Sequence, residues 1–312
     1  MTSGASRAGL ALTAAAGALL ANRRALGRQA KPAAAGAGRL VGTAAGELHV
    51  LEEGAPDAPP AVLVHGFAGS MHWFDRLAPL LRADHRVVRV DALGHGGSAK
   101  PLTDYSIEQQ GAAVAEALGA IGVERALFVG HSFGAAVSVA VAEHAPGLVE
   151  RLVLLDEGPT PEFGHEPFMT RLGFAPVIGE LLHRLAFGSA IRDGYRDAFA
   201  GGFDMATGFD DPDQVVHDFR AMTFPSYSRS WAAEQAFLAA SGLDERLRRL
   251  GIPVHAVFGR EDAFFRADDC AAAYRRLPNA RVEVLEEAGH SPNVERAAEV
   301  ARVVRDLAAV AA

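Results

Sequence analysis

The chain of 312 residues contains a single cysteine, Cys270. An intrachain disulfide and a cluster of cysteine metal ligands are therefore excluded, a pattern that fits a reducing compartment. Charged residues make up only 22% of the chain and aromatic residues 7%, whereas 49% of the residues are hydrophobic. This composition excludes a disordered chain, and no collagen repeat or coiled-coil heptad is present. The length suffices for one large domain or one domain with a sizeable insertion.

The chain also lacks long basic runs, and its net charge is −8. A nucleic-acid-binding protein would carry a basic face, so we expect no nucleic-acid partner. None of the twelve histidines shows the His-Glu-x-x-His spacing of a zinc site. The histidines therefore indicate no zinc site, and we expect the protein to use no metal and no organic cofactor.

An uncharged apolar run long enough to cross a membrane, about 20 residues, is missing near the amino terminus. The run at 8–21 has 14 residues and lies in a segment, 1–40, that has no acidic residue and a net charge of +6. We expect an Ala-rich basic terminal segment, and three alternatives stay open: a loosely docked helix, a signal peptide, and peripheral membrane contact through residues 1–31. The expected location is cytoplasmic, with membrane association only through this segment.

From residue 41 onward, short apolar runs alternate with longer helical stretches. Alternating strands and helices, with strands that are nearly continuous in apolar residues, are typical of an α/β domain. We predict a mostly parallel, doubly wound sheet with a helical cap. Residues 41–159 and 233–312 form the expected core, because residues 160–232 contain no good strand and interrupt the alternation. The predicted strands are 48–51, 61–64, 86–90, 126–129, 152–155, 253–258 and 281–285.

The motif Gly130-His131-Ser132-Phe133-Gly134 follows one predicted strand and opens a helical run. This strand–turn–helix context is the one that a nucleophile elbow requires, in which a sharp turn exposes the serine hydroxyl. The backbone N–H of Phe133 would point to where an oxyanion forms, and the start of the helix adds a positive dipole there.

Three further motifs follow the carboxyl ends of predicted strands, where ligands bind in an open α/β sheet. His65-Gly66-Phe67 forms a turn that can present the Phe67 N–H as a second oxyanion donor. Asp262 and His290 follow two later strands, which gives the chain order serine, aspartate, histidine. Glu261 and Asp156 compete with Asp262 for the role of the acid.

With these motifs the sequence resembles the α/β-hydrolase fold family, in its serine-hydrolase branch with a helical cap. The resemblance covers residues 40–310, and it implies Ser132 as nucleophile, His290 as base and Asp262 as the acid that orients the histidine. It also implies that the amides of Phe67 and Phe133 form the oxyanion hole. Haloalkane dehalogenases and epoxide hydrolases look similar but use Asp as nucleophile, so those activities are not expected.

The substrate pocket is expected to be apolar and lined by side chains from the core and the cap. The predicted lining residues are His65, Trp73, His131, Phe163, Phe168 and Trp231. Cys270 lies in a predicted helix without a catalytic signature, so we do not expect it to be a nucleophile.

The predicted function is hydrolysis of a small, largely apolar carboxylic ester through an acyl-enzyme, with a small molecule as the partner. The alternatives are hydrolysis of a carbon–carbon bond in a diketone-like substrate, cofactor-free perhydrolase (haloperoxidase) activity, and a non-catalytic ligand-binding member of the fold. The sequence does not determine the physiological substrate or the oligomeric state, because a fold supports many functions.

Overall fold

In the computed structural model, the described residues are 37–102, 104–164, 173–175 and 178–309. Eight strands form one sheet in the order β1-β2-β4-β3-β5-β6-β7-β8. The prediction of an α/β fold with a mostly parallel sheet is confirmed, since β3 to β8 pair in parallel and only the β1–β2 and β2–β4 pairs are antiparallel. The strands are β1 (Arg39–Thr43), β2 (Gly46–Glu53), β3 (Pro60–Val64), β4 (Arg86–Val90), β5 (Ala126–His131), β6 (Val149–Leu155), β7 (Val254–Gly259) and β8 (Ala280–Leu285).

The first strand is the element that the sequence did not predict. β1 begins at Arg39, inside the segment 1–40 that we expected to precede the domain, and it pairs with β2 at the edge of the sheet. Of its five residues only Val41 is buried, so the strand carries none of the continuous apolar pattern that marks the central strands. Residues 1–36, which include the predicted membrane-contact segment 1–31, lie outside the described residues.

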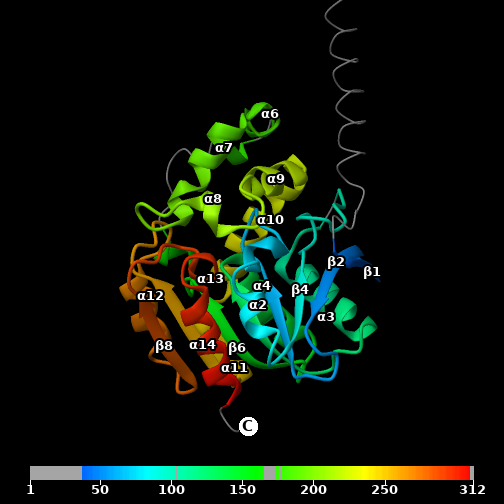
Figure 1. Ribbon diagram of the computed structural model, residues 1–312, viewed down its shortest axis with the longest axis vertical. Coiled ribbons are helices and arrows are strands. Elements are labelled where there is room, and N and C mark those ends of the chain that lie inside the picture. The colour runs from blue at the N-terminus through cyan, green and yellow to red at the C-terminus, as the bar shows by residue number, and fades with distance from the viewer. Residues whose placement is uncertain (1–36, 103, 165–172, 176–177, 310–312) are drawn as a thin grey trace, which may run out of the picture.

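Helices cover both faces of the sheet (Figure 1), and alternate strand residues enter two separate cores. In β5, Phe128 packs with one core, whereas Leu127 and Val129 pack with the other. This alternation follows from the two-residue period of a strand. The first face is covered by α3 (Ile107–Ala120), α4 (Phe133–His144), α11 (Leu243–Leu250) and α12 (Ala267–Tyr274), and the second by the 3-10 helix η1 (Met71–Phe74), α2 (Ala78–Leu81) and α14 (Ala297–Ala308).

Between β6 and β7 the described residues form helices and loops (Figure 1). Five of these helices precede α11: α6 (Ile178–Leu185), α7 (Gly188–Tyr195), α8 (Met205–Gly208), α9 (Gln214–Ala221) and α10 (Phe224–Ala240). The short 3-10 helices η2 (Pro161–Phe163) and η3 (Arg196–Ala198) lie in the same part of the chain. A third apolar cluster joins them to the core domain, and it includes Trp73 after β3, Ile191 in α7 and Val215 in α9. We call the helices α6 to α10 the cap helices. The last of them, α10, continues past residue 232, where we expected the cap to end.

Within the described ranges, every helix is too short or too polar to span a bilayer.

Candidate active site

Ser132 lies at the sharp turn between β5 and α4. Its backbone has φ +49° and ψ −123°, a conformation that costs energy for a residue with a side chain. The surrounding fold maintains it, because the Ser132 N–H donates to the Leu155 carbonyl at the end of β6 at 2.8 Å. The side chain is therefore held above the carboxyl ends of the central strands, where it lines a cavity.

Asp262 and His290 meet at the same edge of the sheet. His290 Nδ1 lies 2.9 Å from Asp262 Oδ2, and the other carboxylate oxygen of Asp262 accepts the N–H groups of Phe264 at 2.7 Å and Phe265 at 3.2 Å. Burial raises the pKa of Asp262, but His290 and the two amides outweigh this effect, so the pKa lies below its ordinary value. An ionised Asp262 fixes the proton of the imidazole on Nδ1 and leaves Nε2 free as an acceptor.

The two competing carboxylates have other partners. Glu261 is exposed, and its Oε2 accepts the backbone N–H of Gly201 at 3.0 Å. Asp156 is fully buried beside Asp262, and its Oδ1 accepts the Gly259 N–H at 2.8 Å. Burial and the charge of Asp262 raise the pKa of Asp156 well above its ordinary value, so Asp156 is the protonated member of this pair. Oxygens of Asp156 and Asp262 and a nitrogen of His290 all lie within 4.8 Å of one another.

The hydroxyl of Ser132 makes no hydrogen bond to His290 in the described part of the chain, although both side chains line the same cavity. The serine side chain is instead close enough to Glu157 to lower the pKa of that carboxyl slightly. The Ser–His hydrogen bond that we expected is thus not formed in this structure. Catalytic hydrogen bonds are often long or misaligned without a ligand and tighten when a substrate binds.

Of the two backbone amides that we expected to bind an oxyanion, one belongs to Phe67, which lines the cavity, and the other to Phe133, which directly follows Ser132. Phe133 is the first residue of α4, so its N–H has no partner within the helix. Phe67 belongs to the turn after β3, which the hydrogen bond from Gly69 N–H to the Gly66 carbonyl closes at 3.1 Å. Residues 66–68 line the cavity beside Ser132.

The cavity has a volume of about 710 Å³ and lies between the carboxyl edge of the sheet and the cap helices. Of the predicted pocket residues, Trp73, His131 and Trp231 line it together with Ser132 and His290. Trp73 stacks on His131, and the Nε2–H of His131 donates to the His290 carbonyl at 2.7 Å. Burial and the neighbouring His290 lower the pKa of His131 to about 3, so this ring stays neutral and acts as a fixed wall.

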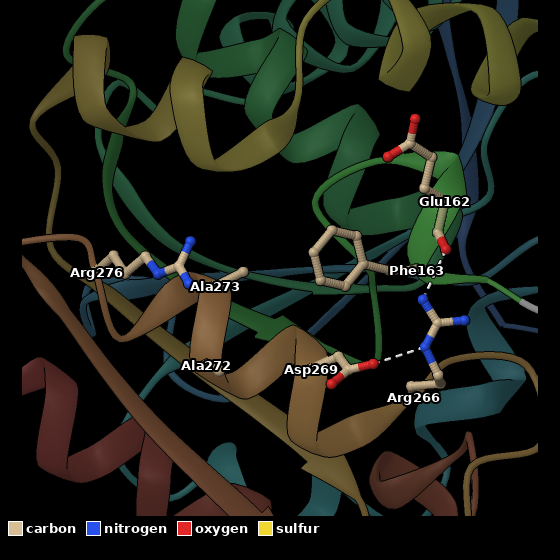
Figure 2. A pocket seen from close by; sticks show the side chains of 7 residues that line it. All are labelled: Glu162, Phe163, Arg266, Asp269, Ala272, Ala273 and Arg276. Atoms are coloured by element: carbon tan, nitrogen blue, oxygen red, sulfur yellow. Dashed lines mark hydrogen bonds and ion pairs between the residues drawn. The ribbon is translucent and has the colours of Figure 1, made fainter.

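Two predicted pocket residues lie elsewhere. His65 is fully buried and does not line the cavity. Its ring is held by two hydrogen bonds: Nδ1–H donates to the Gly66 carbonyl at 2.8 Å, and Nε2 accepts the Ala92 N–H at 3.1 Å. Phe163 lines a separate, shallower hollow, which Figure 2 shows with Arg266 and its partner Asp269. A turn residue and a cap aromatic were plausible lining residues by position, but neither points into the main cavity. Phe168 lies outside the described residues.

Sequence reasoning missed the acidic side chains around the cavity. Glu157 and Glu234 are buried and line it, although buried glutamates are rare. Glu295 accepts the N–H groups of Gly289 at 2.9 Å and Ser291 at 3.3 Å, which fixes both neighbours of His290. Glu157 could have been found, since it lies two residues after the buried end of β6. Glu234 and Glu295 lie in helices whose sequence gives no such signal.

The chain was compared with protein families, with curated sequences and with solved structures. A model of the alpha/beta hydrolase family matches residues 61–303. An uncharacterized hydrolase of Bacillus subtilis is 26% identical over 261 residues, which is 81% of this chain and 90% of the relative.

Two solved structures share the fold. The carboxylesterase CesB of Bacillus subtilis has a TM-score of 0.68 at 20% identity, covering 93% of this chain and 96% of that one. The enol-lactonase of Burkholderia xenovorans has a TM-score of 0.67 at 22% identity, covering 87% and 100%. Taken with the serine turn, the parallel sheet and the matched length, these findings show that the chain is an enzyme of the α/β hydrolase family.

Proposed function

We propose that the protein is a serine hydrolase that cleaves a small, largely apolar carboxylic ester through an acyl-enzyme. The observation that carries this proposal is the 2.9 Å contact between His290 Nδ1 and Asp262 Oδ2 beside a strained Ser132 in one cavity. An oriented histidine next to a serine at a nucleophile elbow is the machinery of acyl transfer.

In the proposed mechanism, Ser132 rotates toward His290 when the ester binds, and Nε2 takes the hydroxyl proton as Oγ attacks the carbonyl carbon. The Nδ1–H···Asp262 hydrogen bond stabilises the imidazolium that forms. The proton then passes from Nε2 to the leaving alcohol, and the acyl group stays on Oγ. Water, deprotonated by the same nitrogen, attacks the acyl-enzyme and releases the acid.

The amides of Phe67 and Phe133 would bind the negative oxygen of each tetrahedral intermediate. Donors of this kind lower the barrier by about 3 kcal/mol each. The rings of Phe67, Phe174 and Trp231 pack with one another at centroid distances of 5.1 to 6.1 Å and provide an apolar surface for the substrate. The carboxylesterase and lactonase that share the fold act on carboxylic esters, including cyclic ones, which agrees with this substrate class.

The test is hydrolysis of a panel of short p-nitrophenyl esters and of a diketone by the full chain and by Ser132→Ala. We expect ester turnover that Ser132→Ala reduces by a factor on the order of 10⁴ or more while the variant stays folded. Cleavage of the diketone without ester cleavage would reassign the enzyme to carbon–carbon bond hydrolysis. No turnover of either substrate would contradict the proposal.

A further inference from the structure

Two acidic side chains in the active-site cavity lack the partners that buried charges need. Glu157 is 1% exposed and Glu234 is 4% exposed, yet both line the cavity that contains Ser132. Both oxygens of Glu157 and Oε1 of Glu234 have no hydrogen-bond partner. Buried carboxyl groups without a partner are costly, so such a pair in a ligand cavity calls for an explanation.

The surrounding protein supplies no positive charge to this pair. Among the described residues, no Arg, Lys or His nitrogen lies within 4.0 Å of either carboxyl group. Burial raises the pKa of Glu234 to about 8. Burial, followed by the charges of Glu234 and Asp262, raises the pKa of Glu157 well above its ordinary value. The charge of Glu234 thus disfavours ionisation of Glu157. A cation in the cavity would stabilise the ionised form of both carboxyl groups.

The aromatic side chains next to the pair suit a cation as well. Tyr227, Trp231 and Glu234 recur every three or four residues in α10, so they share one face of that helix, and all three line the cavity. The ring of Phe174 stacks on Trp231 at 5.1 Å and on Tyr227 at 4.9 Å. Aromatic faces attract ammonium groups, and carboxylates accept their N–H donors.

We propose that Glu157 and Glu234 form a recognition site for a primary ammonium group on the acyl part of the substrate. This inference rests on the proposed ester hydrolysis and narrows its substrate class. Because the Ser132 side chain lies close enough to Glu157 to influence it, the ammonium group belongs within a few bonds of the scissile carbonyl. The ammonium provides the missing charge and up to three N–H donors for the unpartnered oxygens.

The test compares two esters of the same shape, p-nitrophenyl β-alaninate and p-nitrophenyl butanoate, at pH 8.5. Glu234 is then mostly ionised and an alkyl ammonium is still charged. We expect the full chain to prefer the ammonium ester at least tenfold in kcat/KM, after correction for buffer hydrolysis. Glu157→Gln and Glu234→Gln should each lower this ratio about tenfold or more, as loss of a charge-assisted hydrogen bond does.

The ratio separates recognition from chemistry, because both esters share the same acylation step. Glu245→Gln is the matched control, since it removes one negative charge from the exposed surface of α11 and should leave the ratio unchanged. A ratio near one in the full chain, or a ratio that both pocket variants preserve, would overturn the ammonium site and leave ester hydrolysis intact.

A binding experiment tests the site independently of turnover and of variant folding. Calorimetry of Ser132→Ala with β-alaninamide and with butanamide should show at least tenfold tighter binding of the charged amide. Equal affinity for the two amides would overturn the site. If neither ester is hydrolysed but the charged amide binds more tightly, the ammonium site stands and the proposed esterase activity fails.

Discussion

At the scale of single residues, several hydrogen bonds hold the carboxylate of Asp262 in one orientation. Its carboxylate accepts two backbone N–H groups and faces His290, and its side chain is fully buried. Such a constrained carboxylate can hold one orientation and one tautomer of the imidazole ring.

We expect Asp262→Asn to lower kcat for a p-nitrophenyl ester by a factor on the order of 10⁴, because the amide favours the wrong tautomer of His290. Stopped-assay kinetics with purified, folded variant measures this loss. The neighbouring Glu261→Gln is the matched control and should change kcat less than threefold, because its new amide oxygen still accepts the Gly201 N–H. A comparable loss in the control, or full activity in Asp262→Asn, would contradict the assigned role.

At the scale of secondary-structure elements, the crossing of α4 and β3 explains the glycine after the nucleophile. A Cβ atom on Gly134 would lie 2.1 Å from the Val64 carbonyl oxygen, so only glycine lets the helix start this close to the strand. The same close approach places the start of α4 against the carbonyl of His65, which precedes the turn that carries Phe67.

Gly134→Ala should therefore destabilise the protein by several kcal/mol or prevent folding, since backbone must move to make room. Gly119→Ala in α3 is the control, because a Cβ there meets nothing within 4 Å and alanine favours the helix by about 1 kcal/mol. Urea unfolding followed by circular dichroism measures both changes. A Gly134→Ala variant as stable as the parent would contradict the argument.

Another link between elements joins α9 of the cap helices to η1 of the core. Trp73 Nε1–H donates to Asp218 Oδ2 at 2.9 Å, and Gln214 Nε2–H donates to Asp218 Oδ1 at 2.7 Å. Burial raises the pKa of Asp218 to about 7 despite these donors. In the folded protein Asp218 therefore keeps its proton up to about pH 7, whereas in the unfolded chain, with an ordinary carboxyl pKa near 3.8, it loses the proton at a lower pH.

The sign of the resulting pH effect follows from proton linkage. Between about pH 4 and pH 7 the folded state holds more protons, so the contribution of Asp218 to stability is greatest at the acid end and is lost as the pH rises to 7. About three pKa units correspond to roughly 4 kcal/mol over that range. Urea unfolding at pH 5, 6, 7 and 8 should show a shallower pH dependence for Asp218→Asn than for the parent protein. Parallel curves would show that Asp218 does not titrate in this way.

At the scale of the whole molecule, charge is distributed unevenly along the chain. Residues 1–40 carry a net charge of +6, whereas the remaining residues carry −14. An acidic body is repelled by anionic lipid, so any attraction to such a surface must come from the basic segment.

We expect deletion of residues 2–31 to weaken binding to anionic phosphatidylserine vesicles and to leave ester hydrolysis in solution unchanged. Vesicle sedimentation at 50 and 300 mM salt measures the effect, and binding of the full chain should fall at the higher salt because the interaction is electrostatic. Neutral phosphatidylcholine vesicles are the control. Equal binding before and after deletion would remove the predicted membrane contact.

The sequence by itself determined the fold class and the positions of the central strands. β3 to β7 are nearly continuous apolar runs, and the serine motif identifies its own strand–turn–helix context, because both signals are local in the chain. The edge strand β1 could not be predicted in the same way, since its residues gain their order from pairing with β2. The order of Ser132, Asp262 and His290 along the chain also indicated which side chains should meet.

Only the tertiary structure decided which side chains face the cavity. Whether His65 points inward and which of three carboxylates faces His290 depend on rotamers and on contacts across 27 to 159 residues of sequence. Whether Phe163 reaches the main cavity depends on the packing of the fold in the same way. The pairing of Glu157 with Glu234 could not be predicted for the same reason, because the two residues are 77 positions apart in the sequence and only folding buries both in one cavity. The spacing of apolar residues along the sequence shows whether a segment is a helix or a strand. Burial and the pairing of side chains depend on how these segments pack in the folded molecule.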